Sequence, residues 1–343
     1  MSEYRQDATT GAWVIVAPER SRRPSDWLAV GAHGSAAHGD HVCPFCPGNE
    51  RLIPPILDQT PADGTPGWYT RVVANKHPVL RPEGDPAPRP ATLQTRLAGF
   101  GYHEVIIESP RHDADLTTFD DAELHAFVQT WHRRFVDLAR RPGVEAVFVF
   151  RNRGRAAGAS LVHPHSQVIA TAIAAPLVTA RAQWARDRYA QTGCCATCDE
   201  LEREATDGRR TVETTRRFLV TVPYAAGTPF ELRITPFRHA ASFAETTPEE
   251  LAELGPVLRR AVSRLERAVG DPVYNLMIES AGIRDRDPAS DHWSVRIVPD
   301  LVRPGGFELG SGLPINPSSP EDDAAALRAV DISDRNHPSG RLS

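Results

Sequence analysis

Lysine is almost absent from this sequence, since Lys76 is the only lysine among 343 residues and arginine supplies the other cationic side chains. An enzyme that forms a lysine adenylate or a Schiff base needs an activated lysine, and nothing around Lys76 is typical of an activated-amine pocket. The sequence therefore excludes covalent lysine chemistry. The excess of arginine is interpreted as a genomic composition bias.

Long apolar runs are also missing. No stretch approaches the roughly 18 apolar residues that span a bilayer, and the N-terminus has no basic start followed by an apolar segment. We therefore expect no membrane contact and a cytoplasmic location. The net charge of −5 gives no overall attraction for nucleic acid, so no nucleic-acid partner is expected.

Cysteine is scarce and odd in number. Cys43 and Cys46 form one C-x-x-C pair, and Cys194, Cys195 and Cys198 account for the rest of the five. An odd count in a chain without a secretory signal argues against a framework of disulfides. Metal binding is the better interpretation.

The expected elements repeat along the chain. In the first half, apolar residues at helical spacing predict a helix that follows Thr117 and Thr118 and ends near 141–143. A strand over 144–150 is expected next in the chain. In the second half, Thr247 caps a helix that ends before Gly270, and a strand over 273–278 follows.

Metal-ligand residue types fall at matching places in the two halves. The first half carries Cys43, Cys46, His112 and His163, and the second carries Cys195, Cys198, His239 and His292. The interval between the two histidines is 51 residues in the first set (163 − 112) and 53 in the second (292 − 239). The same order of elements and ligands in both halves indicates an internal duplication.

Each of these sets has the composition of a structural zinc site. Two thiolates and two neutral imidazoles close a tetrahedral shell without an open position. The alternative for the second set is a group of buried thiols with surface histidines. In the first set, His41 lies close enough to Cys43 in the sequence to be a rival ligand.

Two histidines stand two residues apart in the run H-P-H-S-Q at 163–167. In an extended chain such residues project to the same face, so zinc can hold His163 while His165 is presented beside it. A neutral histidine with one ring nitrogen free can act as a nucleophile. The alternative is a pair that merely completes a metal site, which leaves Ser166 and Gln167 without a role.

The segment before these histidines, 151–160, reads R-N-R-G-R-A-A-G-A-S. Glycine lets backbone N–H groups approach phosphate oxygens, and arginine, asparagine and serine add side-chain donors. Taken alone, the segment is an ordinary turn from a strand into a loop. Its position directly before a candidate nucleophile favours phosphate binding.

The combination of motifs is similar to that of a known family. H-x-H-x-Q at 163–167 is preceded by R-N-R-G at 151–154 and G-A-S at 158–160, and C-P-F-C-P-G-N-E stands at 43–50. Together these motifs resemble the galactose-1-phosphate uridylyltransferase family of the histidine-triad (HIT) superfamily. The similarity covers nearly the whole chain.

The resemblance implies an α+β fold of two HIT-like lobes from an internal duplication, each an antiparallel sheet with packed helices. It divides the chain into a catalytic lobe, 1–180, and a second lobe with the other zinc site, 181–343, usually in a homodimer that completes the active sites. It also implies substrate contacts. Asn152, Ser160 and Gln167 would hold the α-phosphate, and Arg20, Arg23 and Asn75 would contact the nucleotide.

Gln167 bears on the type of reaction. Hydrolytic members of the superfamily carry a third histidine there, which can protonate a poor leaving group. A sugar phosphate needs less protonation, and an amide can still bind the phosphoryl oxygens in the transition state. Gln167 therefore favours transfer over hydrolysis. In the second lobe Ser294 stands in the nucleophile's place, so we expect that lobe to be catalytically silent.

The second lobe resembles the ADP-glucose phosphorylase-like branch of the family, through G-C-C-A-T-C at 193–198, D-H-W at 291–293 and G-G-F-E-L-G-S-G at 305–312. The best-known uridylyltransferases build their second metal site from a glutamate and three histidines. Glu279 and His292 alone cannot supply that set.

The resemblance implies a zinc enzyme of carbohydrate and galactose metabolism that acts on a nucleotide sugar and a sugar 1-phosphate through a covalent nucleotidyl-His165, with ping-pong kinetics. The first choice is a UDP-glucose and hexose-1-phosphate uridylyltransferase, the family's commonest activity. The alternative is an ADP-sugar or other nucleoside-diphosphate-sugar phosphorylase that uses inorganic phosphate. A hypothesis of another class is a non-catalytic zinc-containing module that binds nucleotides.

Overall fold

Ten strands form one continuous sheet in the computed structural model, which describes residues 2–22, 42–61, 67–85, 89–90 and 95–332. Every neighbouring pair of strands in this sheet is antiparallel. From one edge to the other the strands are β10 (Thr211–Thr214), β11 (Phe218–Thr221), β12 (Leu232–Pro236), β14 (Ser294–Pro299), β13 (Tyr274–Glu279), β8 (Ala146–Arg153), β9 (His165–Thr171), β7 (Gly101–Ile107), β4 (Thr70–Ala74) and β3 (Ile56–Thr60).

The order of the strands repeats on the two sides of the central pair. From the centre outward, one half runs β8, β9, β7, β4, β3 and the other runs β13, β14, β12, β11, β10, so each strand has a counterpart at the same place in the chain order of its half. The α+β fold with an antiparallel sheet in each half is therefore confirmed. The two half-sheets are also joined edge to edge, through β8 and β13. The division of the chain at residue 180 stays a prediction.

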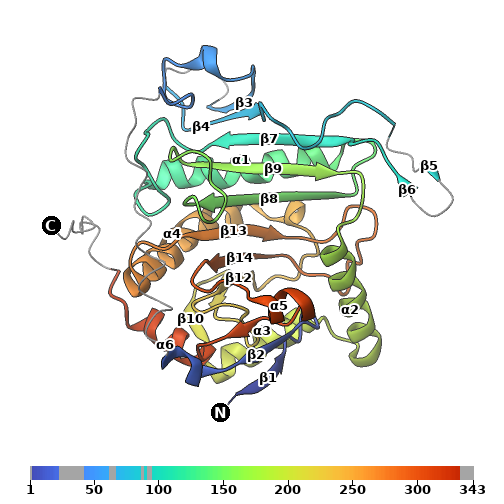
Figure 1. Cartoon of the computed structure of the whole chain (residues 1–343), viewed down its shortest axis with the longest axis vertical. Coiled ribbons are helices and arrows are strands. Elements are labelled where there is room, and N and C mark those ends of the chain that lie inside the picture. The colour runs from blue at the N-terminus through green and yellow to red at the C-terminus, as the bar shows by residue number, and fades with distance from the viewer. Residues whose placement is uncertain (1, 23–41, 62–66, 86–88, 91–94, 333–343) are drawn as a thin grey trace.

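One long helix in each half covers the same face of the sheet. Helix α1 (Asp121–Ala139) begins three residues beyond Thr118, because Asp120 and Glu123 form its capping box. Helix α4 (Pro248–Val269) begins at the expected cap, Thr247, with Glu250 as the reciprocal partner. The two helices pack against each other, and α1 lies behind β7, β8 and β9 in Figure 1.

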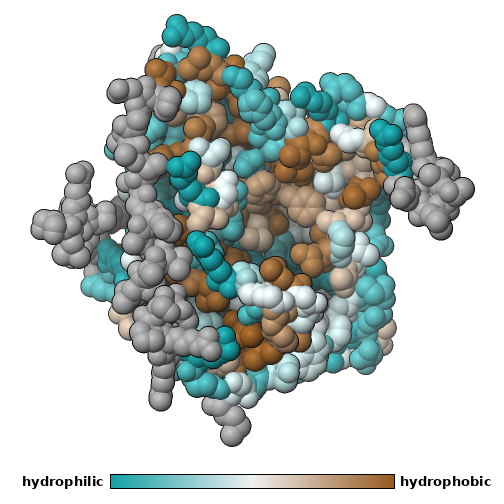
Figure 2. Space-filling view, in the orientation of Figure 1, coloured by the Kyte–Doolittle hydropathy of each residue, from teal (hydrophilic) through white to brown (hydrophobic). Residues whose placement is uncertain are grey.

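The core lies between these helices and the sheet. Phe127, Trp131 and Phe135 of α1 are fully buried there. Burying a side chain of this size stabilises the fold by about 1.5–3 kcal/mol. The opposite face of the sheet is turned toward the viewer in Figure 1, and Figure 2 shows brown apolar residues around a hollow at its centre.

Shorter elements complete the described chain. They are η1 (Pro18–Arg22), η2 (Glu50–Leu52), β5 (Arg89–Pro90), β6 (Thr95–Arg96), α2 (Pro176–Thr192), α3 (Ala196–Asp207), η3 (Phe243–Glu245), α5 (Gly306–Ser311), β15 (Ile315–Asn316) and α6 (Pro320–Ala329). None of the described helices is long and apolar enough to cross a membrane.

The N-terminal strands lie against the C-terminal half. Strands β1 (Glu3–Gln6) and β2 (Trp13–Val16) form a three-stranded sheet with β15. The turn between β1 and β2 is fastened by an ion pair of 2.9 Å between Asp7 and the buried Arg233. The charge of Arg233 overcomes the cost of burying Asp7 and lowers the pKa of Asp7 to about 2.

Candidate active site

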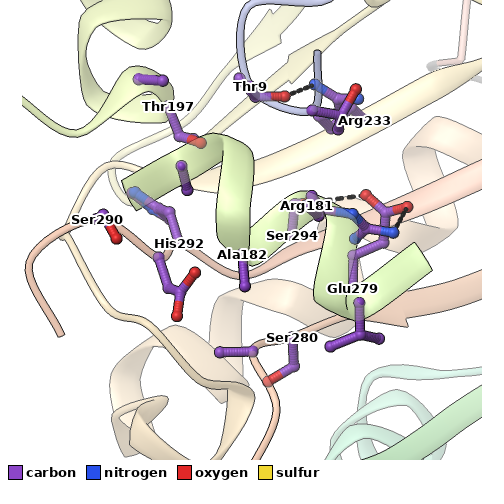
Figure 3. A pocket seen from close by; sticks show the side chains of 16 residues that line it. Thr9, Arg181, Ala182, Thr197, Arg233, Glu279, Ser280, Ser290, His292 and Ser294 are labelled. Carbon is purple, nitrogen blue, oxygen red and sulfur yellow. Dashed lines mark hydrogen bonds and ion pairs between the residues drawn. The ribbon is translucent and has the colours of Figure 1, made fainter. Parts of the chain in front are cut away.

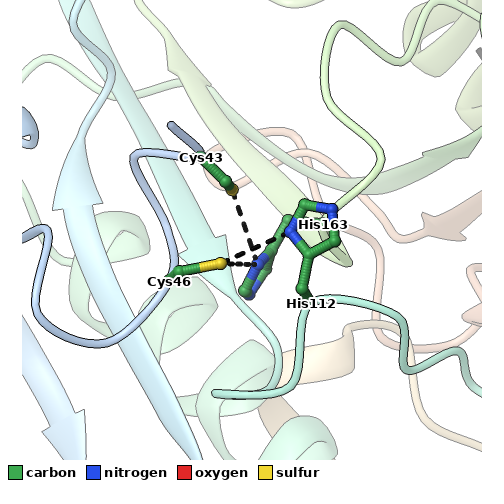
Figure 4. A group of neighbouring side chains, drawn as sticks. All are labelled: Cys43, Cys46, His112 and His163. Atoms are coloured by element: carbon green, nitrogen blue, oxygen red, sulfur yellow. Dashed lines mark hydrogen bonds between the residues drawn. The ribbon is translucent and has the colours of Figure 1, made fainter. Parts of the chain in front are cut away.

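Two cysteines and two histidines from three separate segments meet beside the start of β9. Cys43 and Cys46 come from the loop before η2, His112 from the loop after β7, and His163 from the segment before β9 (Figure 4). Sγ of Cys46 lies 3.4 Å from Nδ1 of His112 and 3.7 Å from Nδ1 of His163. Sγ of Cys43 also lies 3.7 Å from Nδ1 of His163.

These distances suit one tetrahedral ion. Metal–ligand bonds of about 2.0–2.3 Å place the ligand atoms of a tetrahedron about 3.3–3.8 Å apart. The outer nitrogen of His163, Nε2–H, donates to the carbonyl oxygen of Ser109 at 2.8 Å, so the lone pair of Nδ1 faces the sulfurs. Burial lowers the pKa of His163 to about 4, which keeps the ring in the neutral form that a metal requires.

The second predicted set is assembled in the same way in the other half. Sγ of Cys198 lies 3.3 Å from Nδ1 of His239 and 3.6 Å from Nδ1 of His292, and Sγ of Cys195 lies 4.0 Å from Nδ1 of His292. The outer nitrogens of both histidines donate to backbone carbonyl oxygens, at 2.7 and 3.0 Å. The four side chains could therefore hold a metal ion. The rival ligand His41 lies outside the described residues.

His165 is the first residue of β9 and is 7% exposed. Its Nδ1–H donates to the carbonyl oxygen of His163 at 2.9 Å, so Nε2 carries the free lone pair. Burial lowers the pKa of His165, which favours the neutral ring. The edge of the Phe45 ring meets His165 with 5.6 Å between the ring centres, and meets His163 at 5.9 Å. Phe45 thus connects the cysteine loop to the candidate nucleophile.

His165 and Gln167 lie on the face of the sheet opposite α1. Ser166, which stands between them, points the other way and accepts a hydrogen bond of 3.0 Å from the indole N–H of Trp131 in α1. The hydroxyl of Ser166 in turn donates to the buried carboxylate of Glu108. Because side chains alternate along a strand, this anchoring fixes the direction of both neighbours.

The side chain of Gln167 is held by two other residues. Its Oε1 lies 2.7 Å from Nε2 of His103 on β7 and 3.5 Å from Nδ2 of Asn75, which follows β4. Asn75 therefore lies beside Gln167, and its contact with the nucleotide stays a prediction. His103 had no predicted role.

The two arginines at the start of the 151–160 segment do not add donors for a phosphate. Arg151 is 3% exposed and is paired with Glu108 at 2.9 Å and Asp115 at 2.8 Å. Arg153 is paired with Asp115 and Asp271, both at 2.6 Å. The expectation that these arginines face a phosphate is wrong, because carboxylates occupy their guanidinium groups: the buried Glu108, the half-buried Asp115 and the exposed Asp271.

Asn152, between those arginines, has the opposite orientation. Arg151 pairs with Ser166, so Asn152 stands in register with His165. Its Oδ1 accepts a hydrogen bond of 2.9 Å from Nδ2 of Asn275, which also donates to the carbonyl oxygen of Ala157 at 2.9 Å. Asn275, on β13 of the other half, thus holds both Asn152 and the loop that follows it.

The remaining predicted substrate contacts are dispersed. Ser160 is exposed in the loop before His163. Arg20 lies in η1, after the N-terminal strands, and Figure 1 shows this dark blue segment at the opposite end of the molecule from β9. Arg23 lies outside the described residues.

The second half has a pocket where the first half has His165 (Figure 3). Ser294 is the first residue of β14, as His165 is the first of β9, and it pairs with Glu279. Arg181 and Arg296 lie 3.2 and 3.8 Å from the carboxylate of Glu279. The second half thus has a serine in the place of the imidazole and Arg296 in the place of Gln167, and the charged groups around Ser294 pair with one another.

Sequence reasoning missed His103, Asn275 and Phe45. The sequence did carry a signal for His103, because it is a polar residue inside the strand-like run G-Y-H-E-V-I-I. Side chains alternate along a strand, so His103 and Glu104 must lie on opposite faces of the sheet. Asn275 gave no signal, since it reaches the site from the other half of the chain. Phe45 lies inside the C-P-F-C motif, where the cysteines alone were assigned a role.

Comparison with known proteins identifies relatives of this chain. The family model described as galactose-1-phosphate uridyl transferase, N-terminal domain, matches residues 1–174. ADP-glucose phosphorylase of Arabidopsis thaliana is 33% identical over 334 residues, which are 96% of this chain and 93% of that protein. Galactose-1-phosphate uridylyltransferase of Thermotoga maritima is 27% identical over 342 residues, 97% of this chain and 99% of that protein.

A solved structure is similar to this chain over nearly its whole length. The crystal structure of ADP-glucose phosphorylase from Arabidopsis thaliana with bound ADP-glucose has a TM-score of 0.82 and 31% identity, over 97% of this chain and 100% of that one. The fold and the site, with these relatives, define an enzyme of the nucleotidyltransferase class. The chain belongs to the galactose-1-phosphate uridylyltransferase family, as its motifs predicted.

Proposed function

We propose that this enzyme transfers a nucleotidyl group from a nucleoside diphosphate hexose to a second phosphate acceptor, through a covalent intermediate on Nε2 of His165. One observation carries the proposal. The hydrogen bond of 2.9 Å from Nδ1–H to the carbonyl oxygen of His163 leaves Nε2 as the nitrogen with a free lone pair. That arrangement is what a histidine nucleophile needs.

The reaction has two matched steps. Nε2 of His165 attacks the α-phosphorus, a nitrogen–phosphorus bond forms, and the bond from that phosphorus to the hexose 1-phosphate oxygen breaks with the electron pair leaving on the sugar phosphate. The positive charge that develops on the ring is stabilised through Nδ1–H by the carbonyl of His163. A phosphate oxygen of the acceptor then attacks the same phosphorus and Nε2 leaves.

Neutral donors around His165 would stabilise the phosphoryl oxygens. Asn152 stands in register with His165, Gln167 is two residues along the same strand face, and Ser160 lies in the adjoining loop. Amide and hydroxyl donors placed in advance stabilise charge that develops in the transition state. We assign all three to the α-phosphate, with Asn75 toward the nucleotide.

Zinc is the metal that best fits both clusters, because two thiolates and two imidazoles at tetrahedral spacing leave no open position. A bound zinc would supply structure and no Lewis-acid step. Its part in the first cluster is to hold His163, whose carbonyl oxygen orients His165.

Metal analysis of the purified enzyme is expected to find about two zinc ions per chain, one for each closed set. Cys43→Ser should remove about one equivalent and most of the activity, because that cluster adjoins His165. The matched variant Cys195→Ser should remove the other equivalent with a smaller loss of activity. One equivalent in the parent, unchanged in Cys195→Ser, would contradict the second site.

The names of the relatives support two candidates for the nucleotidyl group that is transferred, adenylyl and uridylyl. Identity of 33% with an ADP-glucose phosphorylase, against 27% with a uridylyltransferase, favours adenylyl transfer from ADP-glucose to phosphate. The second cluster, with no glutamate ligand, agrees with that choice. Uridylyl transfer between UDP-glucose and a hexose 1-phosphate is the second candidate, since the family model and the relative from Thermotoga maritima carry that name.

Intact mass of the enzyme after brief incubation with each nucleotide sugar decides between them. We expect an AMP adduct from ADP-glucose to form faster than a UMP adduct from UDP-glucose. The reverse order would assign the enzyme to uridylyl transfer. Any nucleotidyl adduct also excludes a non-catalytic zinc module, because binding alone leaves no covalent mass.

We also propose a homodimer in which each chain completes the site of the other. Arg20 belongs to η1, and Figure 1 shows this dark blue segment far from β9, so we assign Arg20 to the site of a second copy, and Arg23 to the same role. A cytoplasmic location is proposed as well, since none of the five cysteines forms a disulfide in the described residues, which suits a reducing compartment.

A further inference from the structure

His103 lies on the same face of the sheet as the nucleophile, one strand away. In the register of β7 against β9, Val105 pairs with Gln167 and His103 pairs with Ile169, so His103 is a diagonal neighbour of Gln167. Long side chains can meet across that diagonal. Nε2 of His103 lies 2.7 Å from Oε1 of Gln167, and His103 is 9% exposed.

The backbone decides which nitrogen of His103 carries the hydrogen. The N–H of Val79 donates to Nδ1 of His103 at 3.2 Å, so Nδ1 is the unprotonated nitrogen. A neutral imidazole has one N–H group, and here it must be on Nε2. His103 therefore donates to Oε1 of Gln167 at 2.7 Å. Nδ2 of Asn75 lies 3.1 Å from the same Nε2, and because that nitrogen carries the hydrogen, Nδ2 cannot donate to it and is left to donate toward Oε1.

The same hydrogen bond decides how the amide of Gln167 is turned. Nδ2 of Asn75 also faces Oε1, at 3.5 Å, and the Oδ1 of Asn75 is committed to the N–H of His77 at 2.8 Å. Both neighbours therefore present N–H groups to Oε1. The NH2 group of Gln167 is turned away from these donors and is left to bind an acceptor.

We propose that His103 is a positioning residue that keeps the NH2 group of Gln167, and not its carbonyl oxygen, toward the transferred phosphoryl group. This role rests on the proposed function of Gln167. A reversed amide would place a carbonyl oxygen against a phosphoryl oxygen, two acceptors with no hydrogen between them. The donor would then be lost although Gln167 is still present.

Two matched variants separate the two hydrogen bonds of His103, the one with the N–H of Val79 and the one with Oε1 of Gln167. His103→Gln keeps an N–H group long enough to reach Oε1 of Gln167. His103→Asn keeps an acceptor for the N–H of Val79, but its side chain is too short to reach Gln167. Positioning predicts that His103→Asn slows single-turnover formation of the nucleotidyl enzyme by roughly 10- to 10²-fold, whereas His103→Gln stays close to the parent.

A double-mutant cycle then asks whether the effect passes through Gln167. Rates are measured with saturating ADP-glucose, or with UDP-glucose if that gives the parent's adduct, and zinc content and the melting temperature are recorded for each variant. In a Gln167→Ala background, His103→Asn should cause no further slowing, because there is no amide left to orient. A merely structural role for His103 would slow both backgrounds by the same factor.

Three results would overturn the role of His103 alone: a His103→Asn enzyme as fast as the parent, a His103→Gln enzyme as slow as His103→Asn, or equal slowing in both backgrounds. A parent that forms no adduct, or a Gln167→Ala enzyme as fast as the parent, would overturn the proposed function and with it this role. A failure of the His103 role and a failure of the proposed function are therefore distinguished by which enzyme of the cycle, the parent or a particular variant, departs from expectation.

Discussion

Replacement of His165 by alanine is expected to abolish formation of the nucleotidyl enzyme and all turnover that depends on it. The imidazole supplies the attacking atom, Nε2, whose lone pair is left free by the hydrogen bond between Nδ1–H and the carbonyl oxygen of His163. The first metal cluster does not include His165, so zinc content and the melting temperature should stay near those of the parent. Intact mass and steady-state assays measure the loss.

Ser294→Ala is the matched control for this variant, because Ser294 opens β14 as His165 opens β9. It should leave the rate of adduct formation unchanged, since the second half carries no imidazole at that position. Substantial turnover by His165→Ala would refute the covalent mechanism. A large loss in Ser294→Ala would show that the second half is not silent.

Gln167→Ala is expected to slow both the formation and the release of the nucleotidyl enzyme by roughly 10²–10³-fold, the usual loss for one transition-state donor. The amide binds the same phosphoryl group in both steps, so both should be affected. Rapid-mix single-turnover experiments measure the first step, and decay of the isolated adduct with added acceptor measures the second. Slowing of only one step would contradict the assignment.

Gln167→His should move the enzyme toward hydrolysis. An imidazole at this position can protonate a leaving group and assist water, which an amide cannot do. The adduct of this variant should therefore release free nucleotide faster than that of the parent when sugar phosphate and phosphate are both absent. An adduct no more labile to water would show that Gln167 is not what restricts the enzyme to transfer.

The repeated helices and strands and both ligand sets could be predicted because their signals are local or repeated. Helix α4 begins at Thr247 as expected, since a capping box is a short-range pattern. Helix α1 begins later than Thr118 because Asp120, with Glu123, provides the better cap. Cys43 and His163 are far apart in sequence, yet the matching set of the second half identified them.

Other features could not be predicted because they depend on contacts between distant segments. The edge-to-edge pairing of β8 with β13 follows from how the two half-sheets meet. In the sequence, Arg151 stands near glycines and was predicted to donate to a phosphate. Only the fold shows that Arg151 forms an ion pair with the buried Glu108. His103 looked like one more strand residue until the register placed it beside Gln167.

The most direct test of the mechanism is to locate the nucleotidyl group on the enzyme. The parent is incubated briefly with ADP-glucose or UDP-glucose, digested at a pH that preserves phosphoramidates, and mapped by tandem mass spectrometry. The covalent mechanism predicts one nucleotidyl group per chain, on His165, that disappears when phosphate or a hexose 1-phosphate is added. Turnover without any adduct, or an adduct on a residue other than His165, would contradict it.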